Sequence, residues 1–253
     1  MGERYAVQQR LAGWGRSGQA RLATATAVVV GVGALGGAAA GLLARAGVGR
    51  LRLVDPDRPA LDNLHRQVLY TEADVDAGRS KVEAARRHLS SVNRQVTVEA
   101  IQDELDQSNA AGLLAGADVV IDGLDHPRPR YHLNRACLAQ GVDWVHAGVM
   151  GTGGQLAVIR PGKGPCFECW APPYPPAEPK RSSATHGIFG PLPSCLASLQ
   201  AAEALKLLLG ADQDVLAGML LVELWPLGLR TVEIGPPAVR RCPACGAGGA
   251  QDP

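Results

Sequence analysis

Residues 27–36, Ala-Val-Val-Val-Gly-Val-Gly-Ala-Leu-Gly, decide the fold of this chain. The stretch begins as an unbroken apolar run, which is typical of a buried strand in a parallel sheet. Gly31, Gly33 and Gly36 then form a Gly-x-Gly-x-x-Gly pattern. After a strand and before a helix, that pattern provides a tight turn and lets the backbone approach a nucleotide closely. The stretch therefore predicts a nucleotide-binding loop within an α/β fold.

The residues after this loop extend the unit. Small apolar residues over 34–46 predict a helix that ends at Gly47, and 51–55 predicts the next strand, which together make a βαβ unit. Further predicted elements are helices near 80–92 and at 129–140 and 195–209, and strands at 96–101, 119–122, 144–147, 151–159, 218–224 and 230–234. The late strands are typical of antiparallel pairing. The sequence thus predicts a Rossmann-like, doubly wound, mainly parallel sheet that continues into an antiparallel C-terminal half.

Composition excludes several classes of protein. The chain has 253 residues, 46% of them hydrophobic, and a formal net charge of +1, so its charge does not indicate a nucleic-acid or membrane surface as partner. The N-terminus lacks the apolar region of a signal peptide, and no run of about 18 apolar residues is evident. We therefore expect a cytoplasmic protein that binds neither nucleic acid nor membrane.

We expect residues 1–253 to form a single domain in three parts. A helical arm covers 1–26, a nucleotide-binding half covers 27–150, and an antiparallel half covers 151–253. Within the last part, a proline-dense stretch predicts a mobile surface loop at about 171–190, because proline cannot continue a helix or a central strand.

Two Cys-x-x-Cys pairs lie in the C-terminal half, Cys166-Phe-Glu-Cys169 and Cys242-Pro-Ala-Cys245. Two intervening residues allow both sulfurs of a pair to reach one tetrahedral centre at about 2.3 Å, and two pairs complete a four-cysteine zinc site. Such a site leaves no position open for substrate, so we expect the zinc to be structural. The alternative is a set of ordinary buried or redox-active cysteines, but two matched pairs favour the metal.

Polar residues after the second strand separate two kinds of nucleotide site. The glycine pattern alone would indicate an NAD- or FAD-dependent oxidoreductase. An acidic pair, two amides and two cations follow it: Asp55, Asp57, Asn63, Arg66, Gln67 and Lys81. Arg66 provides a planar fork for phosphate oxygens, and Lys81 provides a compact charge. A triphosphate that loses pyrophosphate needs such cations more than a dinucleotide does, so we expect ATP.

Two further carboxylates, Asp122 and Asp125, lie at the end of the strand at 119–122. Magnesium is usually held by one or two carboxylates together with waters and substrate phosphates. Acidic residues at strand ends also serve as structural caps, and the residues alone leave both roles open.

Taken together and in their order along the chain, these motifs resemble those of the ThiF/MoeB family, the bacterial relatives of ubiquitin-activating enzymes. The resemblance runs from residue 4 to residue 246 and so covers almost the whole chain. Its matching pieces are Arg4-Tyr5, the glycine loop, Ala46-Gly-Val-Gly49, Asp55 with Asp57, Asn63-Leu-His-Arg66-Gln67, Gly78 with Lys81, Leu124-Asp125, Gly153-Gly154, both cysteine pairs and Gln200-Ala-Ala-Glu203-Ala-Leu-Lys206.

The resemblance implies an adenylyltransferase. In this family the C-terminal Gly-Gly carboxylate of a small ubiquitin-like sulfur-carrier protein attacks the α-phosphate of ATP, which gives an acyl-adenylate and pyrophosphate as a step toward a carrier thiocarboxylate. Asp55 would bind the ribose, and Gly148 through Gly154 would border a channel for the glycine tail. The resemblance also implies a homodimer. Because the chain ends at Pro253 without a rhodanese domain, we expect a separate sulfur-donor protein.

The same resemblance assigns roles to the polar residues of the loop region. Asp125 would hold Mg²⁺, while Asn63, Arg66 and Lys81 would face the phosphates. The implied catalytic residues are Arg66, Lys81 and Asp125, and the implied nucleotide-binding residues are Gly31, Gly33, Gly36, Asp55, Asp57, Asn63, Arg66, Gln67, Lys81 and Asp125.

Two residues depart from the family pattern. Val7 stands where the family usually has an arginine that reaches the nucleotide of the other subunit, and Ser183 stands where relatives that form a thioester or persulfide have a cysteine. A serine hydroxyl without a base is a poor acyl or sulfur acceptor at neutral pH, so we expect this protein to adenylate the carrier without itself holding it through a thioester. The alternative is a catalytically weakened member that serves as a carrier-binding scaffold. The sequence does not name the carrier.

Overall fold

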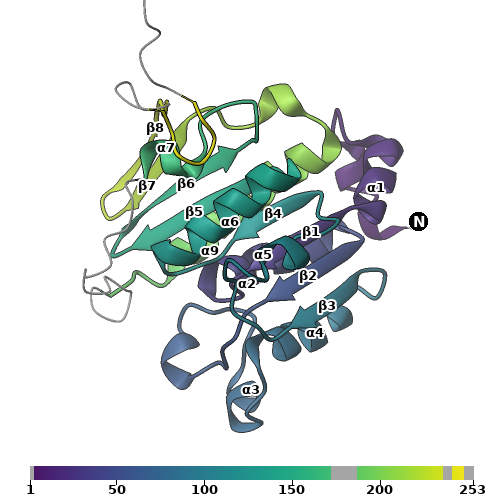
Figure 1. Ribbon diagram of the computed structural model, residues 1–253. Coiled ribbons are helices and arrows are strands. Elements are labelled where there is room, and N and C mark those ends of the chain that lie inside the picture. Colours follow the sequence, from purple (N-terminus) through teal and green to yellow (C-terminus); the bar gives the residue numbers. More distant parts are fainter. Residues whose placement is uncertain (1–2, 172–186, 236–240, 248–253) are drawn as a thin grey trace, which may run out of the picture.

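Figure 1 shows a mixed sheet that crosses the molecule, with helices on both of its faces. The computed structural model describes residues 3–171, 187–235 and 241–247. Within them the sheet has eight strands in the order β3-β2-β1-β4-β5-β6-β7-β8. The strands are β1 (Thr26–Val30), β2 (Arg50–Val54), β3 (Thr97–Ile101), β4 (Val119–Asp122), β5 (Trp144–Met150), β6 (Gly153–Ile159), β7 (Met219–Leu224) and β8 (Leu227–Val232).

The strand order creates a crevice between β1 and β4. The chain moves outward from β1 to β3 and then returns to β4 on the other side of β1, and all of these pairs are parallel. Val30 pairs with both Val54 and Asp122, so the carboxyl ends of three strands meet there, where open α/β sheets bind ligands. From β5 to β8 the pairs are antiparallel. The predicted fold class is confirmed.

Helices α2, α4 and α9 pack on one face of the sheet, and α5, α6 and α7 pack on the other. Successive residues of β1 point to opposite cores, as the period of a strand requires: Val29 joins the first core, and Val28 and Val30 join the second. The helices are α1 (Gly15–Thr24), α2 (Ala34–Ala46), α3 (Glu72–Asp76), α4 (Lys81–Val92), α5 (Ala110–Leu113), α6 (Pro127–Gln140), α7 (Phe167–Trp170) and α9 (Pro191–Leu209), with short 3₁₀ turns η1 (Glu3–Tyr5), η2 (Gln8–Arg10), η3 (Leu61–Asn63) and η4 (Asp212–Asp214).

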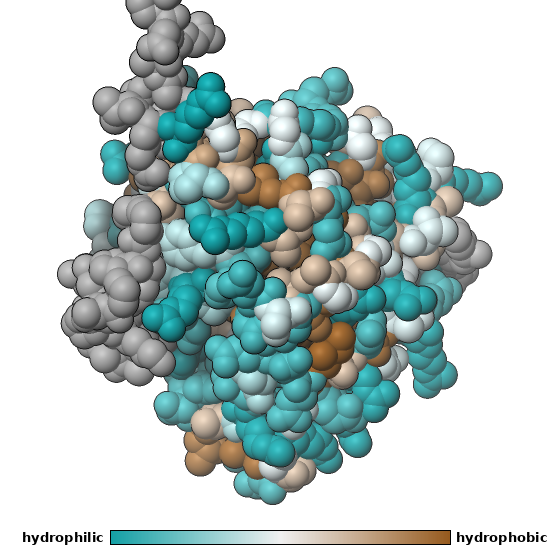
Figure 2. Space-filling view, viewed as in Figure 1, coloured by the Kyte–Doolittle hydropathy of each residue, from teal (hydrophilic) through white to brown (hydrophobic). Residues whose placement is uncertain are grey.

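The long helix α9 begins at Pro191, earlier than predicted, because proline is tolerated in the first turn of a helix. By length and composition α9 could cross a membrane, with a mean hydropathy of 1.2 over its most apolar window. Leu192, Leu196 and Ala204 are fully buried, and α9 packs against α2, β5 and β6, so it is a core helix. On the face drawn in Figure 2 the surface is mostly hydrophilic, with apolar side chains in small patches.

Two turns set the strand boundaries of the antiparallel half. Gly151 has a φ of +59° and turns the chain after β5, so β6 begins at Gly153, slightly later than predicted. The turn at Trp225-Pro226 brings the chain directly back, so β8 begins at Leu227, earlier than predicted. The mobile loop predicted at about 171–190 lies mostly outside the described residues.

Candidate functional site

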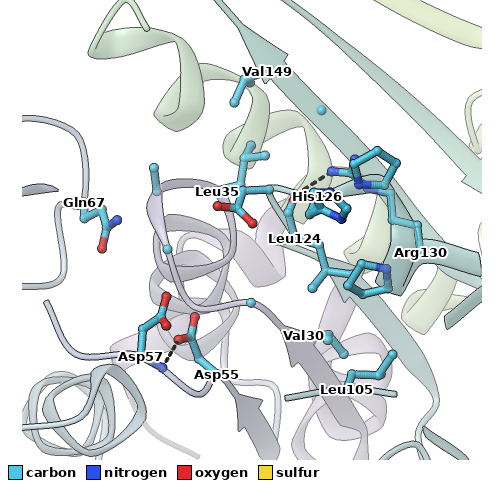
Figure 3. A pocket seen from close by; sticks show the side chains of 18 of the residues that line it. Val30, Leu35, Asp55, Asp57, Gln67, Leu105, Leu124, His126, Arg130 and Val149 are labelled. Carbon is cyan, nitrogen blue, oxygen red and sulfur yellow. Dashed lines mark hydrogen bonds between the residues drawn. The ribbon is translucent and has the colours of Figure 1, made fainter. Parts of the chain in front are cut away.

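A cavity of about 1060 Å³ opens at the carboxyl ends of β1, β2 and β4 and extends to the β5–β6 hairpin. Figure 3 shows Asp55, Asp57 and Gln67 on one side of it and Val149 across from them. The predicted site residues that line it are Gly31, Gly33, Asp55, Asp57, Arg66, Gln67, Lys81 and Asp125. The predicted channel residues that line it are Gly148, Val149, Met150, Gly153 and Gly154.

The glycine loop forms one edge of the cavity because larger residues do not fit. A Cβ at Gly31 would lie 2.6 Å from the Gly123 carbonyl, and the φ of Gly31 is +84°. A Cβ at Gly36 would lie 1.9 Å from the Gly31 carbonyl oxygen. Gly36 therefore packs beneath the loop and does not line the cavity, so its role is to let α2 approach the loop.

A buried carboxylate and a buried ammonium stand beside the loop. Asp55 is 5% exposed; its Oδ2 accepts from the Val32 N–H at 2.7 Å and its Oδ1 from the Asp57 N–H at 2.9 Å. Lys81 Nζ lies 2.8 Å from Asp57 Oδ2 and 3.8 Å from Asp55 Oδ1. Burial raises the pKa of Asp55, and the charge of Lys81 opposes that rise. The two carboxylates thereby hold the Lys81 ammonium group in place at the cavity wall.

The segment after η3 contributes two polar side chains to the cavity wall, the guanidinium of Arg66 and the amide of Gln67. Arg66 and Gln67 line the cavity, whereas Asn63 does not, and its amide donates to Asp62 at 2.9 Å. Gln67 is 6% exposed, and no described residue donates to its Oε1. A buried polar atom without a partner costs free energy, so Gln67 Oε1 is a candidate acceptor for a ligand.

The two aspartates after β4 have different environments, and this decides the question that the sequence left open. Asp125 is exposed and lines the cavity. Asp122 is fully buried, and its Oδ1 accepts from the Leu124 N–H while its Oδ2 faces Arg130 Nε and His146 Nδ1, each at 2.7 Å. Asp122 is therefore placed as a structural residue, which leaves Asp125 as the candidate carboxylate for magnesium.

The sequence did not indicate Arg130 or His146, because they reach Asp122 from α6 and β5. Burial alone would raise the pKa of Asp122, but Arg130 and the His146 hydrogen bond hold it below its ordinary value. Arg130 also donates to the Leu124 and Ala147 carbonyl oxygens. This network joins β4, α6 and β5 at the base of the cavity, where Arg130 is itself a lining residue.

Replacing Arg130 with alanine is expected to lower the free energy of unfolding at pH 7 by about 3–5 kcal/mol, because it leaves the buried Asp122 carboxylate without its cation. In the wild type the pKa of Asp122 is depressed, so the stabilisation is present above the unfolded pKa of about 3.9 and is lost as pH falls through the folded value. The difference in the free energy of unfolding between the wild type and Arg130→Ala should therefore become smaller as pH falls, because the Asp122 carboxyl group of the variant takes up a proton.

Urea unfolding at pH 7 and near pH 4 measures both effects. Arg86→Ala is the control, because it breaks an exposed pair with Glu83 and is expected to change stability little. If Arg130→Ala lowers the free energy of unfolding only slightly at pH 7, or by the same amount at both pH values, then Arg130 does not stabilise the fold by neutralising Asp122.

The four cysteines gather as predicted, although the two pairs are distant in sequence. All four sulfurs lie within 4.8 Å of one another, with Cys166–Cys242 at 3.6 Å, Cys169–Cys245 at 3.5 Å and Cys166–Cys169 at 3.9 Å. Four sulfurs at 2.3 Å from a tetrahedral zinc would be about 3.8 Å apart. Burial raises the pKa of Cys166 to about 11, so a buried cluster of thiolates needs a cation. The geometry and the donor set fit zinc.

Helix α6 holds the first cysteine pair in place. Asn134 is fully buried; its amide donates to Cys166 Sγ at 3.6 Å and to Glu168 Oε1 at 3.2 Å, and its Oδ1 accepts from the Phe167 N–H. Arg135 donates to both oxygens of Glu168. The cysteine cluster is thereby tied to the helix that begins beside the cavity.

Of the two departures from the family pattern, only Val7 lies among the described residues. Val7 is 78% exposed and does not line the cavity. Ser183 lies outside the described residues.

Solved structures with a similar fold include MccB of E. coli. Its structure with ATP has a TM-score of 0.79 and 23% sequence identity, and the match covers 97% of this chain and 75% of that chain. At this identity the likeness shows the fold alone.

Curated relatives are more similar in sequence. The sulfur carrier protein adenylyltransferase of Thermus thermophilus is 40% identical, over 96% of this chain and 90% of the relative. The SAMP-activating enzyme E1 of Haloferax volcanii is 37% identical, over 93% and 85%. The adenylyltransferase and sulfurtransferase MOCS3 of Anopheles gambiae is 39% identical, but this chain spans only 49% of it. The ThiF family model matches residues 5–244, and the chain belongs to the ThiF family.

Proposed function

We propose that this chain uses ATP to adenylate the C-terminal carboxylate of a small ubiquitin-like sulfur-carrier protein that ends in Gly-Gly. The observation that carries the proposal is the cavity: it has a glycine loop and fixed cations at one end and a glycine-rich hairpin at the other. Relatives named for activating a sulfur carrier and a SAMP protein support it. NAD-dependent oxidation would leave the cations and the hairpin end without a role.

The nucleotide would bind at the loop end. Asp55 is held by two backbone N–H groups and has lone pairs left for ribose hydroxyls, while Gln67 Oε1 offers a further acceptor. Arg66 and Lys81 would face the phosphates, because they are the cations among the predicted site residues that line the cavity. Asn63 lies outside the lining, so it is not among the residues that we propose to face the phosphates.

In the reaction a carboxylate oxygen of the carrier forms a bond to the α-phosphorus, and the bond from that phosphorus to the bridging oxygen breaks, so pyrophosphate leaves. Two anions must meet, and Arg66 and Lys81 would reduce their repulsion while the cavity positions them. Asp125 is an exposed carboxylate of the cavity lining and would hold magnesium together with waters and the phosphates of the nucleotide. When bound, the ion would neutralise charge on the leaving pyrophosphate.

The remaining proposals concern the oligomeric state, the cellular location, the sulfur donor and the metal content of the protein. We propose a homodimer in the cytoplasm and a separate protein as sulfur donor, with one structural zinc ion per chain. Because position 7 is an uncharged valine, the cation that the family usually supplies from the other subunit would have to come from another residue or be absent, which predicts slower adenylation than in relatives that have the arginine.

ATP–pyrophosphate exchange with candidate carriers tests the proposal. We expect exchange only when a carrier ending in Gly-Gly is present, and none with the same carrier after removal of its last glycine, because the carboxylate then no longer reaches the phosphate. Carrier binding without any exchange favours the scaffold alternative. Binding of NAD in place of ATP contradicts the proposal.

A further inference from the structure

Gln155, on β6, is a polar residue of the cavity wall that the proposed nucleotide site does not use. It lies opposite Gly148 in the β5–β6 pair, and both residues line the cavity. Between β6 and β2, the strand that leads to Asp55, lie β1, β4 and β5. At about 4.8 Å for each strand spacing, Gln155 is about 19 Å from Asp55 across the sheet. It therefore belongs to the end of the cavity that the nucleotide leaves free.

A buried histidine fixes the amide of Gln155. His146 is 1% exposed, and Asp122 already has Arg130 as its cation at 2.7 Å, so the contact with Asp122 does not require a charged ring. Burial and the charge of Arg130 lower the pKa of His146, while the hydrogen bond to Asp122 opposes this, and the neutral ring is the favoured form. Its Nδ1 lies 2.7 Å from Asp122 Oδ2, and its Nε2 lies 3.1 Å from Gln155 Nε2. Because the Asp122 carboxylate can only accept, the ring proton is on Nδ1. His146 Nε2 is then an acceptor, and only the NH₂ group of Gln155 can face it.

The other end of this amide is available to a ligand. No described residue donates to Gln155 Oε1, and the side chain is half-buried at the cavity wall. The amide cannot rotate by half a turn without placing its oxygen against His146 Nε2, where two acceptors would oppose each other. Oε1 is therefore an acceptor with a fixed direction.

Aromatic packing keeps the histidine in place. The His146 ring contacts Phe167 and Trp170, with ring centroids 5.4 Å away in each case, and Trp144 at 6.0 Å. Phe167 and Trp170 are the first and last residues of α7, which contains Cys169. The cysteine cluster thus supports the orientation of Gln155 from behind, and a group held in this way binds with less loss of entropy.

The wall around Gln155 suits an extended peptide. A Cβ at Gly154 would lie 2.7 Å from the Gly148 carbonyl oxygen and 2.8 Å from Leu196 Cδ2, so this position is restricted to glycine. Gly148 and Gly153 also lack side chains, which leaves room for a backbone beside the hairpin. A peptide N–H that enters this cavity loses water and needs an acceptor.

We infer that Gln155 is a specificity residue that accepts, through Oε1, one of the last two peptide N–H groups of the carrier tail. The inference rests on the proposed function and adds the atom that recognises the substrate. Asp122, Arg130 and His146 are positioning residues, because they act through the direction of the Gln155 amide.

The variant Gln155→Met keeps the length of the side chain and removes the acceptor. In the exchange assay, with the Gly-Gly carriers encoded in the same genome, we expect its KM for the carrier to rise about three- to tenfold, as for the loss of one neutral hydrogen bond. The KM for ATP should not change. Gln140→Met is the matched control, because Gln140 is exposed on α6 and outside the cavity.

A second probe changes the substrate and leaves the enzyme intact. In two semisynthetic carriers, an ester oxygen replaces the last or the second-last peptide N–H. The wild type should lose about three- to tenfold in kcat/KM with one of the two esters, and Gln155→Met should not distinguish that ester from the amide. Combining His146→Ala with Gln155→Met should add little to either single effect, because both act on one contact.

The outcomes separate the inference from the proposed function. If the wild type exchanges with the amide carriers, and its kcat/KM is the same for both ester carriers as for the amide carriers, the inference is wrong and the proposed function stands. If the wild type exchanges with no Gly-Gly carrier at all, both fail.

Discussion

Replacing Asp125 with alanine is expected to lower carrier-dependent pyrophosphate exchange by about 10²–10³-fold, the usual loss when one transition-state contact is removed. Asp125 is exposed and lines the cavity, so we expect its loss to remove the carboxylate that holds magnesium beside the phosphates and to leave the fold intact. Thermal unfolding and exchange rates at saturating ATP and carrier measure the two consequences separately.

The control for this variant is Asp76→Ala. Asp76 is an exposed carboxylate at the end of α3 and does not line the cavity, so exchange should stay at the wild-type level. Asp125→Ala with full exchange activity contradicts the role of this carboxylate. A loss of exchange that is accompanied by a large fall in melting temperature would point to folding instead of chemistry.

Replacing Cys166 with serine is expected to lower the zinc content from one ion per chain to nearly none and to destabilise the fold severely. A structural zinc ion contributes on the order of 10 kcal/mol to folding, and Cys166 is 1% exposed and contacts Cys242 across the cluster. The elemental zinc content of purified protein and its melting temperature are the measurements.

Cys195→Ser is the matched control. Cys195 lies on α9, is partly exposed and is not one of the four clustered cysteines, so the variant should keep its zinc and its melting temperature. A Cys166→Ser protein that retains stoichiometric zinc would show that the cluster is not the metal site. Because Phe167 and Trp170 pack on His146, loss of zinc should also impair exchange in any protein that remains folded.

Local patterns in the sequence were sufficient to predict the fold. The glycine loop and the apolar strands depend on neighbouring residues, and the missed end of β5 and the missed starts of β6 and β8 lie at turns, such as the one at Gly151. The cysteine cluster was predictable despite a separation of 76 residues between Cys166 and Cys242, because the spacing within each pair is itself local. The proline-dense loop and Ser183 lie outside the described residues and stay predictions.

The polar network around Asp122 was not predictable, for a physical reason. Asp122 and Asp125 are three positions apart and look equivalent in sequence, yet one is fully buried and the other is exposed. What distinguishes them is Arg130 on α6 and His146 on β5, which reach Asp122 only once the sheet has formed. Gln155 likewise shows no pattern of its own, because its orientation depends on a buried histidine from the neighbouring strand.

Activation of the carrier's terminal carboxylate by this chain and ATP is tested most directly by intact-mass spectrometry of the carrier, after incubation with the chain, ATP and magnesium. We expect a carrier that has gained one AMP at its C-terminal glycine, and no adduct without ATP or without that glycine. A carrier that binds the chain and ATP but never acquires AMP would contradict it.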